Sequence, residues 1–551
     1  MGASLLDSRF ARAASLTLLA VLVVAGLLAN LGPVGTNDIG FHLRLGQEIA
    51  ASGPPRVDNH SFTAPGVPYP DHEWLTQLGL YALYALSGVP GLAVAQGGLI
   101  GVTLALVAYS ARGPAPLRAL AVLSVLLLSF DHSEIRPHLV GWIYIAVLGL
   151  LIERRRFGWM LVLLVLWANT HASVLLGVGL AGLACLEEAA RTQRRLPLAW
   201  AAAVAVVPLL NPYGIEVYTL FFQISGNADF VGEWQPYASN TWQFFLLVSI
   251  VGVAVVGILK HRFNPFDVVR LLVLATLSFK ASRSGVVMAI ALAPSFGRWY
   301  GVDVARWSGR ARLGVTALVT LAAMALLGVR WRDGEAMRLT LDHEHLPVAA
   351  VSFLDRHGVT GPMYNDYNFG GYLLWKRSEQ PVFMDGRIEV YRGAPLAAYH
   401  RIEGAEPGWE KLADDYGIAY FLVRPERRIT KALLDAPGWE LVYFDYNATI
   451  FVRADRFPAL RTLDVISPYG NRDPKAISSS ITEMEYVVGE NPLFFGGYKV
   501  LAFLLYKSGD ASGAAKRLAR YLELHPAGAR LGDTQELIAG LTKRGVWPVP
   551  N

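Results

Sequence analysis

Long apolar runs recur from Ala11 to about Val329, and they constrain the fold more than any other feature of the chain. A run of about 20 apolar residues crosses a bilayer as a helix, whereas soluble domains lack such repeats. Charged residues make up 17% of the 551 positions, below the roughly one quarter that is typical of soluble domains. We therefore predict a polytopic α-helical membrane domain over residues 1–329, with about 11 spans.

Two apolar segments differ from an ordinary membrane span. The first run, Ala13–Asn30, follows two arginines but is long for a secretory signal, and no small-residue cleavage site follows it. We expect it to be a retained first span. The stretch Leu75–Ser87, about 13 residues long, is too short to cross comfortably. We expect it to form a juxtamembrane or half-inserted helix of the outer loop, with the next long run beginning near Gly88.

The short loops between the runs alternate in charge. One set is basic, as in Glu153–Arg156, Arg191–Arg195 and Arg298–Arg312, and basic residues near span ends mark the cytoplasmic side. Most of the net charge of +5 sits in such loops, so it does not predict a nucleic-acid partner. We expect a multi-pass protein of a bacterial inner membrane, with a cytoplasmic N-terminus. The loop at 33–74 and the C-terminal domain are then periplasmic.

The periplasmic loop 33–74 is dense in ionisable side chains. It contains Asp38, His42, His72 and Glu73 beside apolar segments, where carboxylates and imidazoles are costly and tend to mark function. We therefore expect a membrane-surface active site at this loop.

The other outer loops add further acids, imidazoles and cations. Acids can act as general bases there, and cations can hold a phosphate. These acids and cations are the kinds of side chain that are needed to transfer a group from a lipid-linked phosphate donor to an acceptor hydroxyl. The residues concerned are Asp131, Glu134, Arg136, His138, His171, Lys280 and Arg283.

The first loop also resembles a known family. It has an early acid in Asp38–Ile49, a proline-rich middle at Gly53–Pro55 and the exit His72–Leu75 into an amphipathic helix. In this arrangement residues 10–300 resemble the integral-membrane GT-C glycosyltransferases. The resemblance is closest to the bacterial branch related to protein mannosyltransferases and lipid A aminoarabinose transferases. The sequence departs from that pattern at Asn37, where the more usual pair is Asp-Glu, and in its additional histidines.

The resemblance implies a reaction and roles for particular residues. It implies an undecaprenyl- or other polyprenyl-phosphate sugar donor, a lipid, glycan or protein acceptor, and inverting transfer at the periplasmic face of a GT-C-like fold. Asp38 takes the place of the family's base, and Asp131 or Glu134 takes that of a second acid. No ligand spacing such as His-Glu-x-x-His occurs, and the chain has one cysteine, so we expect neither a metal nor another cofactor.

Plainer structural roles stand beside the catalytic ones. Asp38 suits the N-cap of a helix that starts near Phe41, and His72 with Glu73 suits contact with headgroups. The acids and bases of Asp131–His138 suit a salt-bridge cluster between two helices, and His171 suits a hydrogen-bonded helix junction. The two cations Lys280 and Arg283 suit interfacial snorkelling.

After Arg330 the sequence alternates helical and strand-like segments. We predict an α/β domain with a partly parallel sheet over 330–460. Helices are expected at 345–357, 371–376 and 409–416, strands at 361–366, 381–387 and 418–424, and a hairpin at 439–453. Polar clusters at 365–368 and 385–387 suit either ligand binding or turns. The segment 461–551 is expected to be helical and to resemble a tetratricopeptide pair.

Two other functions compete with sugar transfer. A non-catalytic membrane scaffold would use its periplasmic domain to bind partners, and deleting 330–551 would discriminate between it and an enzyme. A transporter is disfavoured because no pair of Gly/Pro-broken helices occupies corresponding halves of the chain.

Overall fold

A computed structural model describes residues 2–225, 234–260, 264–331, 337–464 and 474–548, and the chain divides into two compact units. The first unit comprises Met1–Val57 and Pro68–Leu341. The second comprises Asp58–Val67 and Asp342–Asn551.

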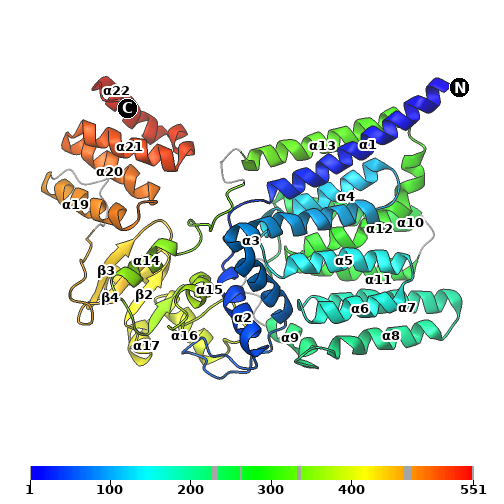
Figure 1. Cartoon of the computed structure of the whole chain (residues 1–551), viewed down its shortest axis with the longest axis horizontal. Helices are drawn as coiled ribbons and strands as arrows, with labels where there is room; N and C mark the ends of the chain where they lie inside the picture. The colour runs from blue at the N-terminus through cyan, green and yellow to red at the C-terminus, as the bar shows by residue number, and fades with distance from the viewer. Residues whose placement is uncertain (1, 226–233, 261–263, 332–336, 465–473, 549–551) are drawn as a thin grey trace. The chain divides into compact units, whose positions relative to one another are not determined.

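The first unit is a bundle of helices (Figure 1). Helix α1 packs on α13 and α3, and α12 packs on α4 and α5, which buries a continuous apolar core. The helices are α1 (Gly2–Ala29), α2 (Ile39–Ser52), α3 (Trp74–Ser110), α4 (Ala115–Leu128), η1 (Phe130–His132), α5 (His138–Glu153), α6 (Phe157–Ala168), α7 (Val174–Thr192), α8 (Leu196–Val206), η2 (Val207–Leu209), α9 (Glu216–Ser225), α10 (Trp242–Lys260), α11 (Pro265–Lys280), α12 (Ser284–Ala305) and α13 (Gly309–Trp331).

Within the described residues, four helices are long and apolar enough to cross a membrane: Phe10–Ala29, Trp74–Ser110, Trp242–Lys260 and Gly309–Gly328. Shorter apolar helices lie between them, at Ala115–Leu128, His138–Glu153, Phe157–Ala168 and Leu196–Leu209. The helical membrane class is therefore supported by length and composition, while the count of about 11 spans stays a prediction.

Helix α3 is divided by a kink at Gly88. Gly88 has a φ of 63°, outside the helical region, and Pro90 follows inside the helix. A positive φ suits glycine because it has no Cβ, and a proline removes a helical hydrogen bond. The kink therefore separates Trp74–Ser87 from the apolar segment that follows, at the boundary expected from the sequence.

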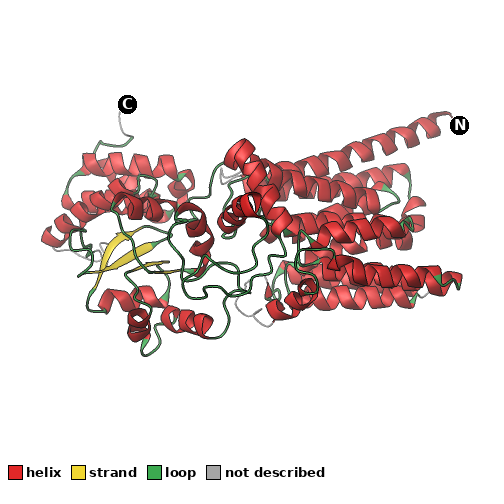
Figure 2. Ribbon diagram, turned by 60° about the horizontal axis from the view of Figure 1, so that its bottom comes forward, coloured by secondary structure: helices red, strands yellow, loops and turns green. Residues whose placement is uncertain are grey.

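The second unit contains a four-stranded sheet covered by short helices (Figures 1 and 2). Its strand order is β1-β2-β4-β3; β1 pairs parallel with β2, and the other pairings are antiparallel. The elements are α14 (Val348–Arg356), β1 (Met363–Asn365), α15 (Tyr367–Lys376), α16 (Ala394–Glu403), α17 (Trp409–Asp415), β2 (Tyr420–Val423), α18 (Arg428–Asp435), β3 (Trp439–Phe444), β4 (Thr449–Arg453), α19 (Pro474–Glu490), α20 (Phe495–Ser508), α21 (Ala511–Leu524), η5 (Pro526–Arg530) and α22 (Gly532–Lys543). The partly parallel sheet and the hairpin were predicted correctly.

The predicted strand at 381–387 was wrong. This segment forms a single bridge, between Val382 and Ser61, and is otherwise irregular. The Asn365 side chain accepts a hydrogen bond from the backbone N–H of Phe383 at 2.9 Å and donates one to the carbonyl of Met384 at 2.7 Å. These backbone groups are therefore bonded to a side chain, so the segment does not extend the ladder.

Residues 58–67 leave the first unit and fold into the second. Val57 and Pro68 pair as an antiparallel bridge, so the segment departs and returns at one place. Inside the second unit, Phe62 donates its N–H to the Val382 carbonyl at 3.2 Å, and Thr63 donates its hydroxyl to the Phe383 carbonyl at 2.6 Å. The tip of the first loop is thus a structural part of the C-terminal unit.

A buried ion network secures this inserted segment. Arg387, 1% exposed, lies 2.8 Å from Asp58 and 2.6 Å from Asp385, both fully buried. Tyr391 donates its hydroxyl to Asp385 at 2.6 Å. Burial raises the pKa of Asp385, but the charge of Arg387 and the hydrogen bonds from Arg387 and Tyr391 together outweigh burial and lower that pKa below its usual value. The polar cluster 385–387 therefore has a structural role here.

We expect Arg387→Met to lower the free energy of unfolding of the second unit by about 3–5 kcal/mol, because two buried carboxylates lose their counter-charge. Urea-dependent proteolysis of the purified full chain measures this loss. Arg401→Met, at an exposed arginine of the same unit, serves as the control. Equal urea sensitivity of the two variants would contradict the role assigned to the network.

Candidate active site

Asp38 and Arg136 form an ion pair between segments that precede different helices. Asp38 stands at the N-cap position of α2, but its side chain makes no capping hydrogen bond. Its carboxylate accepts instead from the Arg136 guanidinium, just before α5. The two side chains are 13% and 20% exposed, so the pair is partly withdrawn from water. An ion pair of this kind compensates a carboxylate for part of the water that it loses.

Three histidines surround the carboxylate of Glu73. Its oxygens lie 3.5 Å from His72 Nε2, 3.7 Å from His171 Nε2 and 4.0 Å from His42 Nδ1. The Glu73 side chain is 16% exposed and the imidazoles are 2–13% exposed. Among the residues that the structure describes, no group of three or more such side chains is arranged to hold a metal ion. The imidazoles point to the carboxylate itself.

Close packing of α2 on α3 brings His42 to Glu73. A Cβ on Gly46 would lie 2.2 Å from the Gln77 carbonyl oxygen, so only glycine permits this approach. Asp71 supports the start of α3, since its carboxylate accepts from the Glu73 N–H at 3.1 Å and from the Gln77 side chain at 3.0 Å. Sequence analysis did not identify Gln77 as part of the site. The sequence does contain a local signal for this contact, because Asp71 lies just before the start of α3 and Gln77 lies in its first turn.

The turn between α6 and α7 is fastened to the same helix start. Trp74 donates its indole N–H to the Asn169 side chain at 3.1 Å, and Thr76 donates to the Thr170 carbonyl at 2.9 Å. His171 Nδ1 lies 2.6 Å from the Ser173 hydroxyl. The hydrogen-bonded junction considered for His171 is therefore present, and it directs the other ring nitrogen to Glu73.

The electrostatics of this group favour an ionised carboxylate on Glu73 and neutral imidazoles on His42 and His171. Burial lowers the pKa of His42 to about 4 and that of His171 to about 3, although Glu73 opposes the shift. Burial raises the pKa of Glu73, but the imidazoles, His72 first, outweigh it and bring the value to about 2. Glu73 is therefore ionised at neutral pH and can accept N–H or O–H groups.

Two further residues connect the pair and the histidine group. His42 lies one helical turn after Asp38, its N–H bonded to the Asp38 carbonyl at 3.1 Å, so both occupy one side of α2. His138 and Arg283 both lower the pKa of His171 electrostatically, which places them near it. The Arg283 guanidinium lies 4.8 Å from the Trp234 ring centre.

The structure thus gathers eight of the eleven candidate residues: Asp38, His42, His72, Glu73, Arg136, His138, His171 and Arg283. Asp131, Glu134 and Lys280 are exposed. Asp131 accepts from the Gln243 side chain at 2.9 Å. A water-sized cavity of about 10 Å³ adjoins His72 and is also lined by Tyr213 and Glu216.

Comparison with known proteins gives little further guidance. No protein-family model matches the chain, and no curated protein matches it. Among solved structures, the arabinofuranosyltransferase AftD from mycobacteria, determined by single-particle cryo-EM, aligns at a TM-score of 0.44 and 15% identity. The alignment covers 81% of this chain and 40% of that chain, so the present chain spans less than half of the mycobacterial protein.

We expect the buried histidines to make the protein less stable in mild acid. Between pH 6.5 and about 4 an unfolded His42 binds a proton that the folded one does not, so stability falls as pH falls, by up to about 1.4 kcal/mol per pH unit. His42→Gln removes this contribution and should reduce the pH dependence of the melting temperature between pH 7 and 5.5, leaving the part that His171 causes. Above pH 5.5 Glu73 is almost fully ionised in the folded and the unfolded state, so it adds little to this pH dependence.

The matched control for this measurement is Gln47→Asn, an exposed and non-titrating position on α2. It should retain the full pH dependence of the unchanged protein. A His42→Gln profile that runs parallel to that of the control would refute the burial of a neutral imidazole.

Proposed function

We propose that the chain is a membrane glycosyltransferase of the GT-C type. It transfers a sugar from a polyprenyl-phosphate donor to a lipid, glycan or protein acceptor at the periplasmic face of a bacterial inner membrane. The observation that supports this most is the gathering of Asp38, Arg136, Glu73 and three histidines from separate interhelical segments. Ionisable groups are costly beside a bilayer and tend to be kept there for function.

In this proposal Asp38 is the general base. The acceptor hydroxyl gives its proton to the Asp38 carboxylate while its oxygen forms a bond to the anomeric carbon. The bond from that carbon to the phosphate oxygen breaks, and the polyprenyl phosphate leaves with the electron pair, which inverts the anomeric centre. Arg136 keeps the carboxylate charged and oriented before the proton arrives.

The remaining candidates bind the two substrates. Arg283 or Lys280 holds the donor phosphate through charge-assisted hydrogen bonds. His42, His72, Glu73, His138 and His171 hold sugar hydroxyls, since ionised Glu73 accepts and the imidazoles both donate and accept. Asp131 or Glu134 supplies a second acid at the exposed rim of the site. The reaction as written uses no metal or other cofactor.

We expect Asp38→Asn to lower kcat about 100- to 10,000-fold, the range typical of a lost general base. Membrane vesicles supplied with a radiolabelled undecaprenyl-phosphate sugar provide the assay. Glu48→Gln, on the same helix and paired with Arg44, is the control and should transfer at the normal rate. Full transfer by Asp38→Asn would remove the proposed base, and absence of transfer by the unchanged protein with every donor tried would favour a scaffold.

We expect Arg283→Gln to raise the KM for the donor about 10- to 100-fold, because a charge-assisted hydrogen bond contributes about 1.5–3 kcal/mol. Because the leaving phosphate gains a negative charge as its bond to the anomeric carbon breaks, kcat should fall as well. Arg191→Gln, an exposed arginine paired with Glu188, is the control. An unchanged donor KM in Arg283→Gln would show that another cation holds the phosphate.

A further inference from the structure

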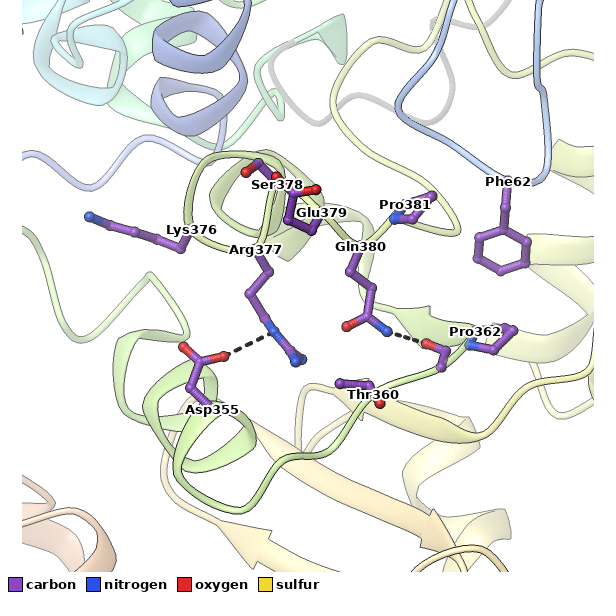
Figure 3. A pocket seen from close by; sticks show the side chains of 11 residues that line it. Phe62, Asp355, Thr360, Pro362, Lys376, Arg377, Ser378, Glu379, Gln380 and Pro381 are labelled. Atoms are coloured by element: carbon purple, nitrogen blue, oxygen red, sulfur yellow. Dashed lines mark hydrogen bonds and ion pairs between the residues drawn. The ribbon is translucent and has the colours of Figure 1, made fainter.

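The second unit contains a groove that takes no part in the proposed transfer step. Its volume is about 630 Å³, within the roughly 300–1,000 Å³ typical of small-molecule sites. Figure 3 shows it between the turn before β1, the segment after α15 and the inserted loop that carries Phe62. All of its lining residues belong to the second unit.

One wall of the groove is fixed by Arg377. Its side chain is 8% exposed, and its guanidinium lies 3.1 Å from the Asp355 carboxylate. It also donates to the Val359 carbonyl at 2.7 Å and to the Tyr420 hydroxyl at 3.0 Å. Nearby, the Gln380 side chain donates to the Gly361 carbonyl (Figure 3). These bonds hold polar groups in place before any ligand arrives, which lowers the entropic cost of binding.

The opposite wall is the aromatic ring of Phe62. Its ring packs edge-on against Phe383, with 5.7 Å between the ring centres, and its backbone is bonded to Val382. The ring is half-buried, so part of it remains accessible from the groove. The ion pair of Asp58 with Arg387 fixes the loop that carries this ring to the second unit.

The lining has a balanced charge and a mixed polarity. Lys376 and Arg377 offset Asp355 and Glu379, so the lining offers no net charge to a phosphate or a nucleic acid. Thr360, Ser378 and Gln380 supply neutral donors and acceptors, and Phe62, Pro362 and Pro381 supply apolar surface. A ligand that matches this lining is neutral, rich in hydroxyls and apolar on its C–H faces.

An extended peptide fits the groove less well. Peptides commonly dock by adding a strand to a free sheet edge. Here β1 is the edge strand, and Asn365 at its end is bonded to Phe383 and Met384. The segment around Val382 therefore already covers the part of the sheet nearest the groove.

We propose that this groove binds a neutral saccharide, as a docking site for the glycan part of the acceptor. The saccharide rings lie against Phe62, and their hydroxyls bond to Thr360, Ser378, Glu379 and Gln380. The assignment to the acceptor rests on the proposed glycosyltransferase function, whereas saccharide binding itself does not.

The test is glycan binding by the full chain in lipid nanodiscs, probed with an array of neutral oligosaccharides, acidic oligosaccharides and peptides. We expect neutral oligosaccharides to be retained. Thr360→Trp fills the groove from an exposed position, and Glu379→Ala removes an exposed acceptor; each should weaken binding at least about 10-fold. Glu410→Ala, an exposed position on α17, is the control.

Each result bears on the proposal separately from the transfer reaction. Retention of acidic ligands or peptides alone, or neutral binding that both groove variants leave intact, would overturn it. Absence of any bound neutral oligosaccharide would do the same. Asp38→Asn should bind the array like the unchanged protein. A result that rules out Asp38 as the base therefore does not rule out saccharide binding in the groove, and a result that rules out saccharide binding does not rule out the base.

Discussion

Removing a charge from water is costly by several kcal/mol unless an opposite charge or several hydrogen bonds accompany it. This constraint governs both units of the protein. In the helical unit it joins Asp38 to Arg136 and surrounds Glu73 with imidazoles. In the α/β unit it places Arg387 between Asp58 and Asp385. In each group at least one partner comes from a segment far away in the sequence, namely Arg136 for Asp38, His171 for Glu73 and Asp58 for Arg387, so the ion pairs also fix the path of the chain.

The two groups differ in what remains available to a ligand. Arg387 and its carboxylates are at most 1% exposed, so their hydrogen-bonding capacity is used internally. Asp38, Glu73, His72 and His171 are 12–16% exposed, which leaves polar surface that a substrate can reach. Partial burial holds these side chains in place through their contacts and still leaves each of them some surface. This contrast is the reason for assigning function to the first group and architecture to the second.

Much of the fold followed from local patterns in the sequence. The apolar runs, the break near Gly88 and the hairpin at 439–453 depend on residues close together, which periodicity and turn chemistry report directly. The candidate site was recognised as a set because its members are unusual beside a membrane. Their pairing was not recognised, since Arg136 meets Asp38 across 98 positions and nothing local links them.

The errors have the same physical origin. Residues 381–387 have a strand-like sequence pattern, but the Asn365 side chain forms hydrogen bonds with the Phe383 N–H and the Met384 carbonyl, which a strand would use to pair with its neighbour. Residues 58–67 lie in the loop 33–74 of the predicted membrane domain, and they fold with the second unit. The charge of Asp58 instead finds its partner in Arg387, more than 300 positions later. Local sequence patterns cannot predict an ion pair between residues that are far apart in the chain.

The placement of residues 58–67 has a consequence for how such a protein can evolve and be engineered. The chain passes between its units at three points, after Val57, after Val67 and after Leu341. A single crossover between genes near position 341 would therefore combine residues 58–67 of one protein with the C-terminal part of another. Asp58 would then keep its ion pair only if the new C-terminal part carried an arginine in the place of Arg387. The segment 58–67 and the C-terminal part must therefore be exchanged or redesigned together.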